Sequence, residues 1–542
     1  MATVTRSGAW EPLKHRAFAI LISANLASNI GTWIQNVGEK WQMAELTRSP
    51  LLISLIETGT TLPILFLALS AGALADILDR RKLLIAAQSY MLLVAAALSA
   101  LTFAHLITPG VLITMSLLLG VGAALTQPAW QAIVPELLPR EEITTGVALN
   151  SAGFNVSRAV GPALGGLIVG IMGAGWAFAL NSLSFLAVVG ALWQWKRVAP
   201  TQDLPSERFM GAVKVGLRYA RHSRPLQIIL SRAAVFVFFT GIIFSLMPSL
   251  AIHRLGTGSE GFGFLLGCIG AGAVAATVFL PRLRARVATN RLLLAFHLLA
   301  VAGIAGLGFS TRPWMAAVAL FACGMSWLSV LSTVNTAIQL SVPSWVKARA
   351  FGCYTMTWGG ALAIGATFWG SVAMRSGIRA AFLASAAGLL LATLLVHRFQ
   401  IEALDHEPDM TPHRAAPHPD SGLDPEAGPI LIQLEYRIPS ARCQAFRAAM
   451  REVRRIRKRD GAIRWSLFEE PASAGQDGTV SFQESFVSSS WGEHLRQHHR
   501  ATMEDREIFA AAYRMDPEGR PRIRHLVAAW EEREALLDRI WE

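Results

Sequence analysis

The sequence predicts an all-α membrane protein that carries a small α+β domain at its C-terminal end. Three observations support this fold class. Hydrophobic residues make up 53% of the 542 residues and charged residues only 16%. The charges are unevenly spread, because residues 1–398 hold 29 Lys+Arg and 12 Asp+Glu, whereas residues 399–542 hold 20 and 25. Long apolar stretches occur only in the first part, so the two parts are expected in different solvents.

Apolar stretches of about the length of a transmembrane helix recur through the first part. An α-helix needs about 20 residues to cross about 30 Å of hydrocarbon. The sequence therefore predicts twelve transmembrane helices, near residues 17–38, 51–74, 83–104, 110–131, 146–170, 175–195, 226–250, 261–281, 290–310, 313–335, 350–374 and 378–397.

The positive charge of the chain follows this membrane topology. The net charge of +12 combines +17 from the first part with −5 from the second, so it gives no reason to expect nucleic acid as a partner. Placing the N-terminus in the cytoplasm collects most Lys and Arg of the short connections on one side, as the positive-inside rule requires. Both termini are then cytoplasmic. The first stretch is too long for a cleaved signal peptide and lacks a small-residue cleavage site.

A weak internal repeat divides the membrane part. Residues 131–135, QAIVP, recur as residues 339–343, QLSVP, 208 positions later. This offset predicts two six-helix lobes, 1–195 and 226–398, joined by a cytoplasmic linker, 196–225. Two such lobes with a binding site between them at the midplane are typical of secondary transporters.

Two motifs carry a family resemblance. Residues 72–82, GALADILDRRK, resemble the cytoplasmic signature of the major facilitator superfamily, although Ile77 and Asp79 stand where a basic residue and Gly are common. The LDRR form is similar to the secretion-effector branch, which includes enterobactin-type siderophore exporters. Residues 157–166, SRAVGPALGG, resemble the motif associated with exporters, with Ser157 in place of a Gly. The resemblance covers residues 10–400 and, in this branch, extends into the C-terminal part.

The resemblance assigns roles to both motifs. It implies that the first is a gating latch of the outward-facing state, formed by Gly72, Asp76, Asp79, Arg80 and Arg81. The alternative is a positive-inside anchor with a helix-capping Asp. For the second motif it implies an exporter-type helix that bends and packs closely. Its residues are Arg158, Gly161, Pro162, Gly165 and Gly166. Close packing alone is the alternative, since small residues do this in any membrane protein.

Ionisable residues deep in the membrane are costly and are therefore candidates for function. Glu57 is the best candidate for a proton-carrying carboxylate, with a structural ion pair as the alternative, and Glu39 is a weaker rival near the outer mouth. Arg158 lies near the midplane, about 18 Å into its stretch at 1.5 Å per residue. Arg232 lies nearer the inner face, where its side chain could instead snorkel to the surface.

Polar side chains form a stripe along the first stretch at helical spacing: Asn25, Asn29, Thr32 and Asn36. In lipid such a stripe must face another helix or a wet cavity. Helices 1, 4, 7 and 10 line the cavity in the resembled fold, which implies lining roles for Asn25, Asn29, Gln127, Gln131, Ser329, Ser332 and Asn335. Four aromatic residues could form apolar walls or simply pack in the core: Phe236, Phe238, Phe239 and Trp327.

The C-terminal part reads as a linker and a domain. Residues 399–428 are rich in Pro and acidic residues, which predicts a flexible linker. Residues 429–542 alternate as βαββαβ, which predicts a ferredoxin-like domain. It resembles the small dimeric domains of antibiotic-biosynthesis monooxygenases, which implies a homodimer through this part. His494 and His498 are four apart, but without a third ligand a solvated helix face is the better interpretation, so we expect no metal and no cofactor.

We therefore expect a proton-coupled exporter of a small amphipathic molecule, such as a siderophore, drug or secondary metabolite. It would work by alternating access in the bacterial inner membrane, with protons, substrate and the lipid bilayer as partners. No GxxxxGK[ST] motif is present to bind a nucleotide. Two alternatives remain open: a membrane-tethered monooxygenase-like enzyme acting through residues 429–542, and a receptor or scaffold that transports nothing. The sequence leaves the substrate and the direction of transport open.

Overall fold

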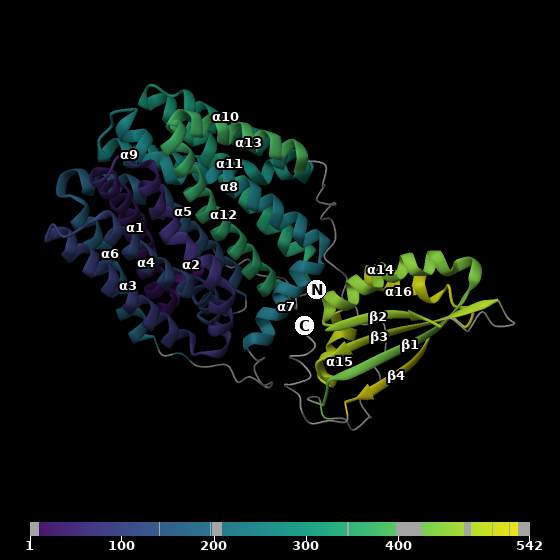
Figure 1. The fold of residues 1–542 in the computed structure, drawn as a ribbon. Coiled ribbons are helices and arrows are strands. Elements are labelled where there is room, and N and C mark those ends of the chain that lie inside the picture. Colours follow the sequence, from purple (N-terminus) through teal and green to yellow (C-terminus); the bar gives the residue numbers. More distant parts are fainter. Residues whose placement is uncertain are drawn as a thin grey trace. The chain divides into compact units, whose positions relative to one another are not determined.

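The computed structural model describes residues 10–139, 141–195, 197, 209–343, 346–396, 424, 427–470, 478–500, 502–519 and 521–528. Long helices form most of it (Figure 1). They are α1 (Arg16–Leu46), α2 (Pro50–Ile77), α3 (Arg80–Phe103), α4 (Pro109–Ile133), α5 (Ile143–Met172), α6 (Ala174–Gln194), α7 (Phe209–His222), α8 (Arg224–His253), α9 (Ser259–Arg284), α10 (Thr289–Phe309), α11 (Pro313–Ser341), α12 (Lys347–Ser376) and α13 (Ile378–Val396).

Eleven helices within the described residues are long and apolar enough to cross a membrane, against the twelve predicted. The difference lies at α12, where a crossing was expected over 350–374. This segment does form a helix of 30 residues, but Gly, Thr, Ser and Trp dilute its apolar residues. The predicted linker 196–225 is also partly helical, because it contains α7.

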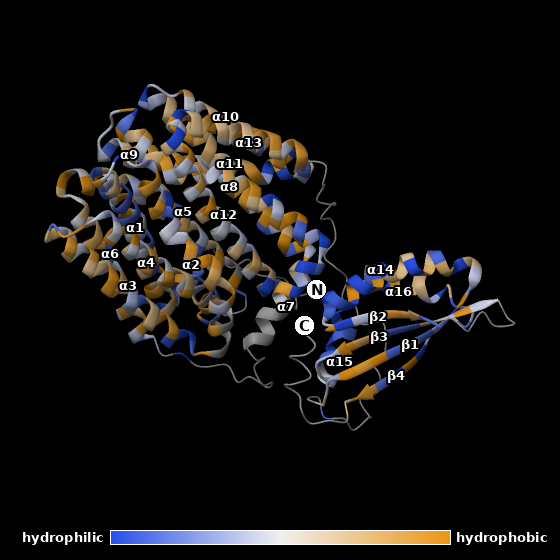
Figure 2. Ribbon diagram, in the orientation of Figure 1, coloured by the Kyte–Doolittle hydropathy of each residue, from blue (hydrophilic) through white to orange (hydrophobic). Residues whose placement is uncertain are grey.

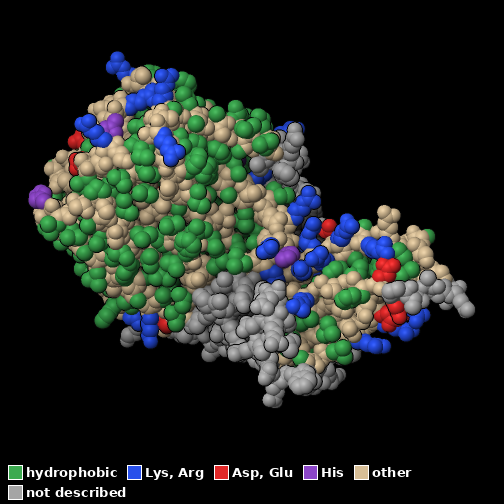
Figure 3. Space-filling model, in the orientation of Figure 1, with side chains coloured by type: hydrophobic (Ala, Val, Ile, Leu, Met, Phe, Trp, Pro, Cys, Tyr) green, Lys and Arg blue, Asp and Glu red, His purple; other side chains and the backbone are tan. Residues whose placement is uncertain are grey.

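The helices pack against one another through apolar side chains with some polar ones among them, and they also turn apolar faces outward. In the N-terminal half, α1 packs on α5 and α6, α2 on α4, and α3 on α4 and α6. In the C-terminal half, α10 packs on α13, while α5 and α9 pack together across the two halves. The outer faces are largely hydrophobic (Figures 2 and 3), with large exposed side chains such as Phe66, Leu93 and Val318. This is the surface expected where lipid replaces water.

The chain divides into two compact units. The first contains nearly all of the membrane helices. The second combines the C-terminal part with Lys214–Gln227 and Ala337–Phe351. In the second unit the end of α7 contacts the C-terminal part directly. Arg218 Nη1 donates to the carbonyl oxygen of Gly461 at 3.0 Å, and the buried Tyr219 ring lies 6.0 Å from the Arg459 guanidinium.

The C-terminal part forms a four-stranded antiparallel sheet in the order β2-β3-β1-β4. Its elements are β1 (Ile430–Pro439), α14 (Cys443–Asp460), β2 (Arg464–Glu469), β3 (Thr479–Ser488), α15 (Trp491–Arg500), α16 (Met503–Tyr513) and β4 (Arg522–Val527). Alternate residues of β1 are buried and pack with α14 in one core, which includes Ile432, Tyr436, Phe446 and Phe482. The predicted linker 399–428 lies almost wholly outside the described residues.

Candidate substrate and coupling site

Arg158 of α5 lies between the two halves of the helical unit. Its side chain is 9% exposed. The guanidinium carbon lies 6.0 Å from the ring centroid of Trp33 on α1 and 6.0 Å from that of Trp327 on α11. Both distances are within the range of cation–π attraction. Among the described residues no carboxylate forms an ion pair with it, so aromatic faces from both halves hold a buried cation.

Glu57 of α2 forms an ion pair with Lys40 of α1. Glu57 Oε2 lies 2.6 Å from Lys40 Nζ, and the two side chains are 12% and 11% exposed. Lys40 Nζ also lies 6.0 Å from the ring centroid of Phe244 on α8, in the other half. The pairing that we considered as an alternative role for Glu57 therefore exists, and it touches the boundary between the halves. The sequence analysis did not name Lys40 as a site residue, although its place next to Glu39 near the end of the first apolar stretch could have indicated it.

Glu39 is the more deeply buried carboxylate, at 1% exposure. Its Oε1 accepts a hydrogen bond from Gln35 Nε2 at 2.6 Å, and its Oε2 accepts one from Ser116 Oγ at 2.8 Å. Asn181 Nδ2 in turn donates to Gln35 Oε1 at 2.6 Å. This network joins α1, α4 and α6 inside the N-terminal half. Glu39 is thus part of a buried network rather than a residue at an open mouth.

The polar stripe of α1 is used within the N-terminal half. Asn25 Nδ2 donates to Asn150 Oδ1 of α5 at 3.2 Å, and Trp130 Nε1 of α4 donates to the same oxygen at 3.4 Å. Asn29 is half-buried, and Gln127 is exposed on α4. The stripe therefore satisfies its polar groups partly between helices, as lipid requires.

Of the four aromatic residues suggested as cavity walls, Phe236 and Trp327 are buried in the core, whereas Phe238 and Phe239 are half-buried. Phe236 is fully buried against His297 and Trp327, and Phe238 and Phe239 form a cluster with Trp369.

The loop between α2 and α3 and the start of α3 form a charged cluster with Glu136, which follows α4, and Arg197, which follows α6. Asp79 caps α3 by accepting from the Lys82 backbone N–H at 3.0 Å, and its Oδ2 lies 3.2 Å from Arg197 Nη1. Arg80 Nη1 and Arg197 Nε reach Glu136 at 2.7 Å each. Partial burial disfavours the charged form of Asp79 and acts to raise its pKa. The hydrogen bond from the Lys82 N–H and the nearby Arg197 guanidinium have the larger combined effect, so the pKa of Asp79 is lowered.

The latch residues thus have partners inside the N-terminal half. Arg81 donates to the backbone oxygens of Leu192 and Trp193 at 2.8 and 3.0 Å. Gly72 is half-buried in α2, and the side chain of Asp76 lies outside the described residues. The capping role that we gave to Asp as an alternative is filled by Asp79, while a latch across the halves stays a prediction. Glu136 and Arg197 were missed because they are distant in sequence from the motif.

The glycines of α5 allow two close helix crossings. A Cβ on Gly165 would lie 3.0 Å from Ile34 Cα of α1, and Gly161 faces Trp33 in the same way. A Cβ on Gly166 would lie 2.8 Å from Gly263 Cα of α9, which is closer than real Cβ atoms come. Pro162 lies inside the helix between these sites. The motif is therefore a packing device between α5 and its neighbours in both halves.

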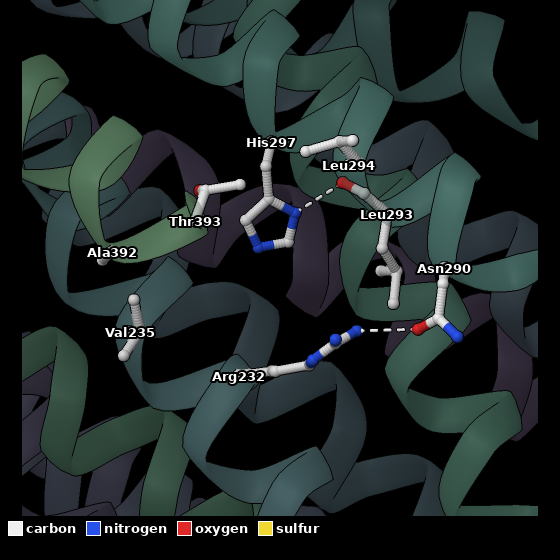
Figure 4. A pocket seen from close by; sticks show the side chains of 8 residues that line it. All are labelled: Arg232, Val235, Asn290, Leu293, Leu294, His297, Ala392 and Thr393. Carbon is white, nitrogen blue, oxygen red and sulfur yellow. Dashed lines mark hydrogen bonds between the residues drawn. The ribbon is translucent and has the colours of Figure 1, made fainter. Parts of the chain in front are cut away.

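Arg232 lies apart from these groups, in a small cavity between α8, α10 and α13 (Figure 4). Its Nη1 donates to Asn290 Oδ1 at 3.1 Å. It lies apart from Glu57, with which it was grouped as a candidate for the proton or substrate site, and from Arg158 of the exporter-type motif.

The buried polar groups of the C-terminal part are paired with one another. Glu484, fully buried, accepts from Tyr436 Oη at 2.7 Å, Trp465 Nε1 at 2.9 Å and Arg457 Nε at 3.1 Å. Arg457 points inward because this buried carboxylate attracts it.

His494 is also buried rather than solvated, at 2% exposure. Its Nε2 lies 3.1 Å from His525 Nε2 and 3.4 Å from His498 Nε2. Even so, the described residues contain no group of three His, Cys, Asp or Glu that could hold a metal ion. Burial, followed by the neighbouring His498 and His525, lowers the pKa of His494 to about 3.

Comparisons with known proteins agree on the class. The family of transmembrane secretion effectors matches residues 7–534. The staphyloferrin A transporter of Staphylococcus aureus (strain NCTC 8325 / PS 47) is 28% identical over 257 residues, which cover 47% of this chain and 64%, just under two thirds, of that transporter. The enterobactin exporter of Shigella boydii serotype 4 (strain Sb227) is 26% identical over 389 residues, covering 70% of this chain and 91% of the exporter.

A solved structure shares the fold of the helical part. It is a bacterial homologue of the human lysosomal transporter Spinster, with a TM-score of 0.57 and 14% identity over 72% of this chain and 98% of that chain. The family and these relatives are transporters and not enzymes. The chain belongs to the transmembrane secretion effectors and is a multi-pass membrane transporter of the major facilitator superfamily.

Proposed function

We propose that this transporter exports a small amphipathic anion in exchange for protons, by alternating access across the bacterial inner membrane. The observation that carries the proposal is Arg158, a buried cation between Trp33 and Trp327 of opposite halves with no carboxylate pair among the described residues. A buried charge is costly unless it is compensated. A bound anion would compensate it, and the two indole rings would contact the apolar part of the same molecule.

The relatives suggest a substrate class. Two of them are named for siderophores, staphyloferrin A and enterobactin. An anionic siderophore would match both the charge of Arg158 and its aromatic surroundings. A drug or another secondary metabolite with a negative charge would fit the same chemistry.

We place proton coupling at the pair of Lys40 and Glu57. A proton on Glu57 would cancel its charge and release Lys40, whose ammonium group also contacts Phe244 of the other half. Loading a proton would thereby loosen a contact between the halves. Glu39, held by neutral donors from Gln35 and Ser116, is the second carboxylate that could take the proton.

Alternating access requires two lobes that separate on one side at a time. We assign the lobes to residues 1–195 and 226–398, include α12 as the twelfth crossing, and place both termini in the cytoplasm. In that orientation the pairs Lys40–Phe244 and Gly166–Gly263 lie toward the outer face. The cluster at Asp79, Arg80 and Arg81 lies toward the inner face, where it would latch the lobes when they close there.

We assign the C-terminal part, 429–542, to a ferredoxin-like domain that joins two copies of the chain. The strand order and the helices that follow β1 and β3 support this arrangement. Leu431 is paired in register with Val487 and Leu526 on neighbouring strands, and Leu526 is 47% exposed. These three side chains would form the apolar centre of a dimer contact.

The test is transport by the purified protein in proteoliposomes with an imposed pH gradient. The panel comprises staphyloferrin A, enterobactin and cationic dyes, with wild type, Glu57→Gln and Arg158→Gln side by side. We expect anionic substrates to be driven by the gradient in wild type, to lose this drive in Glu57→Gln and to lose transport in Arg158→Gln. Transport of the dyes alone would refute the anionic substrate, and transport indifferent to pH would refute proton coupling.

A further inference from the structure

The cavity between α8, α10 and α13 faces away from the boundary between the two halves. Its lining residues are Arg232, Val235, Asn290, Leu293, Leu294, His297, Ala392 and Thr393. Figure 1 shows α10 and α13 side by side on the side of the helical part farthest from α1 and α6. The neighbouring side chains of Leu298, Leu391 and Leu394 are exposed, so this surface meets lipid.

The floor of the cavity is buried and polar, and its rim is half-buried. Arg232, His297 and Thr393 are 5%, 8% and 6% exposed. Asn290 and Leu294 on the rim are half-buried. Figure 4 shows the Arg232 guanidinium and the His297 ring within one space, with Arg232 extended toward Asn290. None of the described residues that line the cavity is acidic, and Arg232 gives it a positive character.

The depth of the cavity matches the level of lipid headgroups. Helix α10 has 21 residues, about 31 Å at 1.5 Å per residue, and so just spans the hydrocarbon core. Asn290 is its second residue, and Thr393 lies three residues before the end of α13. Arg232 starts about 12 Å along α8, but its side chain reaches Asn290. The guanidinium therefore lies at the boundary between hydrocarbon and headgroups.

We propose that this cavity binds the phosphate of an anionic phospholipid. The guanidinium of Arg232 would donate to the phosphate oxygens, because a planar fork of N–H groups suits a phosphate. Asn290 Oδ1 holds the guanidinium in place, while Val235, Leu294 and Ala392 would contact the start of an acyl chain. Basic pockets between transmembrane helices are known to bind lipid headgroups. The inference rests on the proposed function only for the orientation that puts this end in the inner leaflet.

The test is native mass spectrometry of the purified full chain with phosphatidylglycerol or phosphatidylcholine added in equal amounts. We expect wild type to retain one phosphatidylglycerol, and Arg232→Gln to reduce the bound fraction about tenfold. Arg291→Gln is the matched control, because it removes the same charge from the residue after Asn290, where the side chain is exposed. Equal retention in wild type and Arg232→Gln, or an equal loss in Arg291→Gln, would overturn the proposal.

Two further arms address misfolding and the source of the phosphate. Leu294→Trp keeps Arg232 and fills the cavity, so it should also reduce phosphatidylglycerol binding, whereas full retention would argue against the cavity. Inorganic phosphate in excess should leave the bound lipid in place, and displacement would assign the site to free phosphate instead. Lipid retention is measured without any transport, so failure of this proposal is distinguishable from failure of the export proposal.

Discussion

Two buried arginines, one in each unit of the chain, have opposite surroundings. Arg457 of the C-terminal part donates from Nε to Glu484 and lies 4.4 and 4.7 Å from the rings of Phe486 and Phe509. Arg158 of the membrane part has two indole rings at 6.0 Å and no ion pair among the described residues. The first arginine is neutralised by the fold itself. The second has aromatic faces beside it, and in the proposed function an anionic substrate would supply its counter-charge.

The comparison shows how burial separates structure from function. An internal ion pair with its hydrogen bonds satisfied holds a core together, and breaking one side of it is expensive. A buried cation that lacks an internal anion costs stability in every state without ligand, and such groups in membranes mark substrate or ion sites. Substitutions at the two sites should therefore have different effects. Those at the Arg457–Glu484 pair should lower stability, and those at Arg158 should lower transport.

The largest effect is expected for Glu484→Gln. Removing the carboxylate leaves Arg457 buried without its counter-charge, which should lower the local unfolding free energy of the C-terminal sheet by about 3 kcal/mol or more. Hydrogen exchange of the β1 amides in the full chain measures this. Glu469→Gln is the control, because its pair with Arg447 is half-exposed and should contribute less than about 1 kcal/mol. If Glu484→Gln and Glu469→Gln had similar effects, the buried pair of Arg457 and Glu484 would not be a special source of stability.

Arg158→Gln should reduce transport of an anionic substrate about a hundredfold, as expected when a buried charged partner is lost. Exchange of the α5 amides should not become faster, because Arg158 forms no ion pair with any described residue and burial of its charge costs stability. Arg158→Lys keeps the charge and should retain part of the activity. Counterflow in proteoliposomes gives the rates. If Arg158→Gln instead unfolds the helical part, the residue is structural and the contrast with Arg457 disappears.

Lowering the pH should weaken the C-terminal part through His494. Its pKa in the folded chain is about 3 because of burial and of His498 and His525, below the ordinary 6.5. The folded form therefore binds the proton more weakly than the unfolded form. The contribution of neutral His494 to the stability of the C-terminal part is full above pH 6.5 and is lost as the pH falls toward 3. Between pH 7 and 5 the loss should be about 2 kcal/mol. His494→Gln should remove most of this pH dependence, measured by exchange of the β1 amides, and an unaltered slope would contradict the assignment.

The smallest effect is expected at the crossing of α5 and α9. A methyl group on Gly263 would lie 2.7 Å from Gly166 Cα, so Gly263→Ala should destabilise the helical part by about 1 kcal/mol. Gly267→Ala on the same helix is the matched control, since its Cβ would meet its nearest atom at 3.8 Å. Apparent melting temperatures in detergent compare the two. Equal melting temperatures would show that α5 and α9 can accommodate the added methyl group without loss of stability.

The residue pattern alone predicted the long membrane helices and the four strands, but not α7. Apolar stretches with polar breaks specify helices in lipid, because the backbone must satisfy its own hydrogen bonds there. Eleven of the expected crossings meet the criteria of length and hydropathy, and α12 falls short because small and polar residues are frequent in it. In the C-terminal part, β1 and β3 show the burial repeat of every two residues that a strand with one buried face has, whereas β2 and β4 do not. The two motifs indicated the superfamily.

The partners of the charged residues were decided by the tertiary structure. Glu57 meets Lys40, Asp79 meets Arg197 and Arg457 meets Glu484 across 17, 118 and 27 positions, and no local pattern encodes such pairs. The sequence by itself determined which segments enter the membrane and which stay in water, because that depends on the transfer free energy of each segment. Only the tertiary structure decided which buried charges form ion pairs with one another among the described residues and which do not, because Coulomb attraction depends on distances that the fold alone creates.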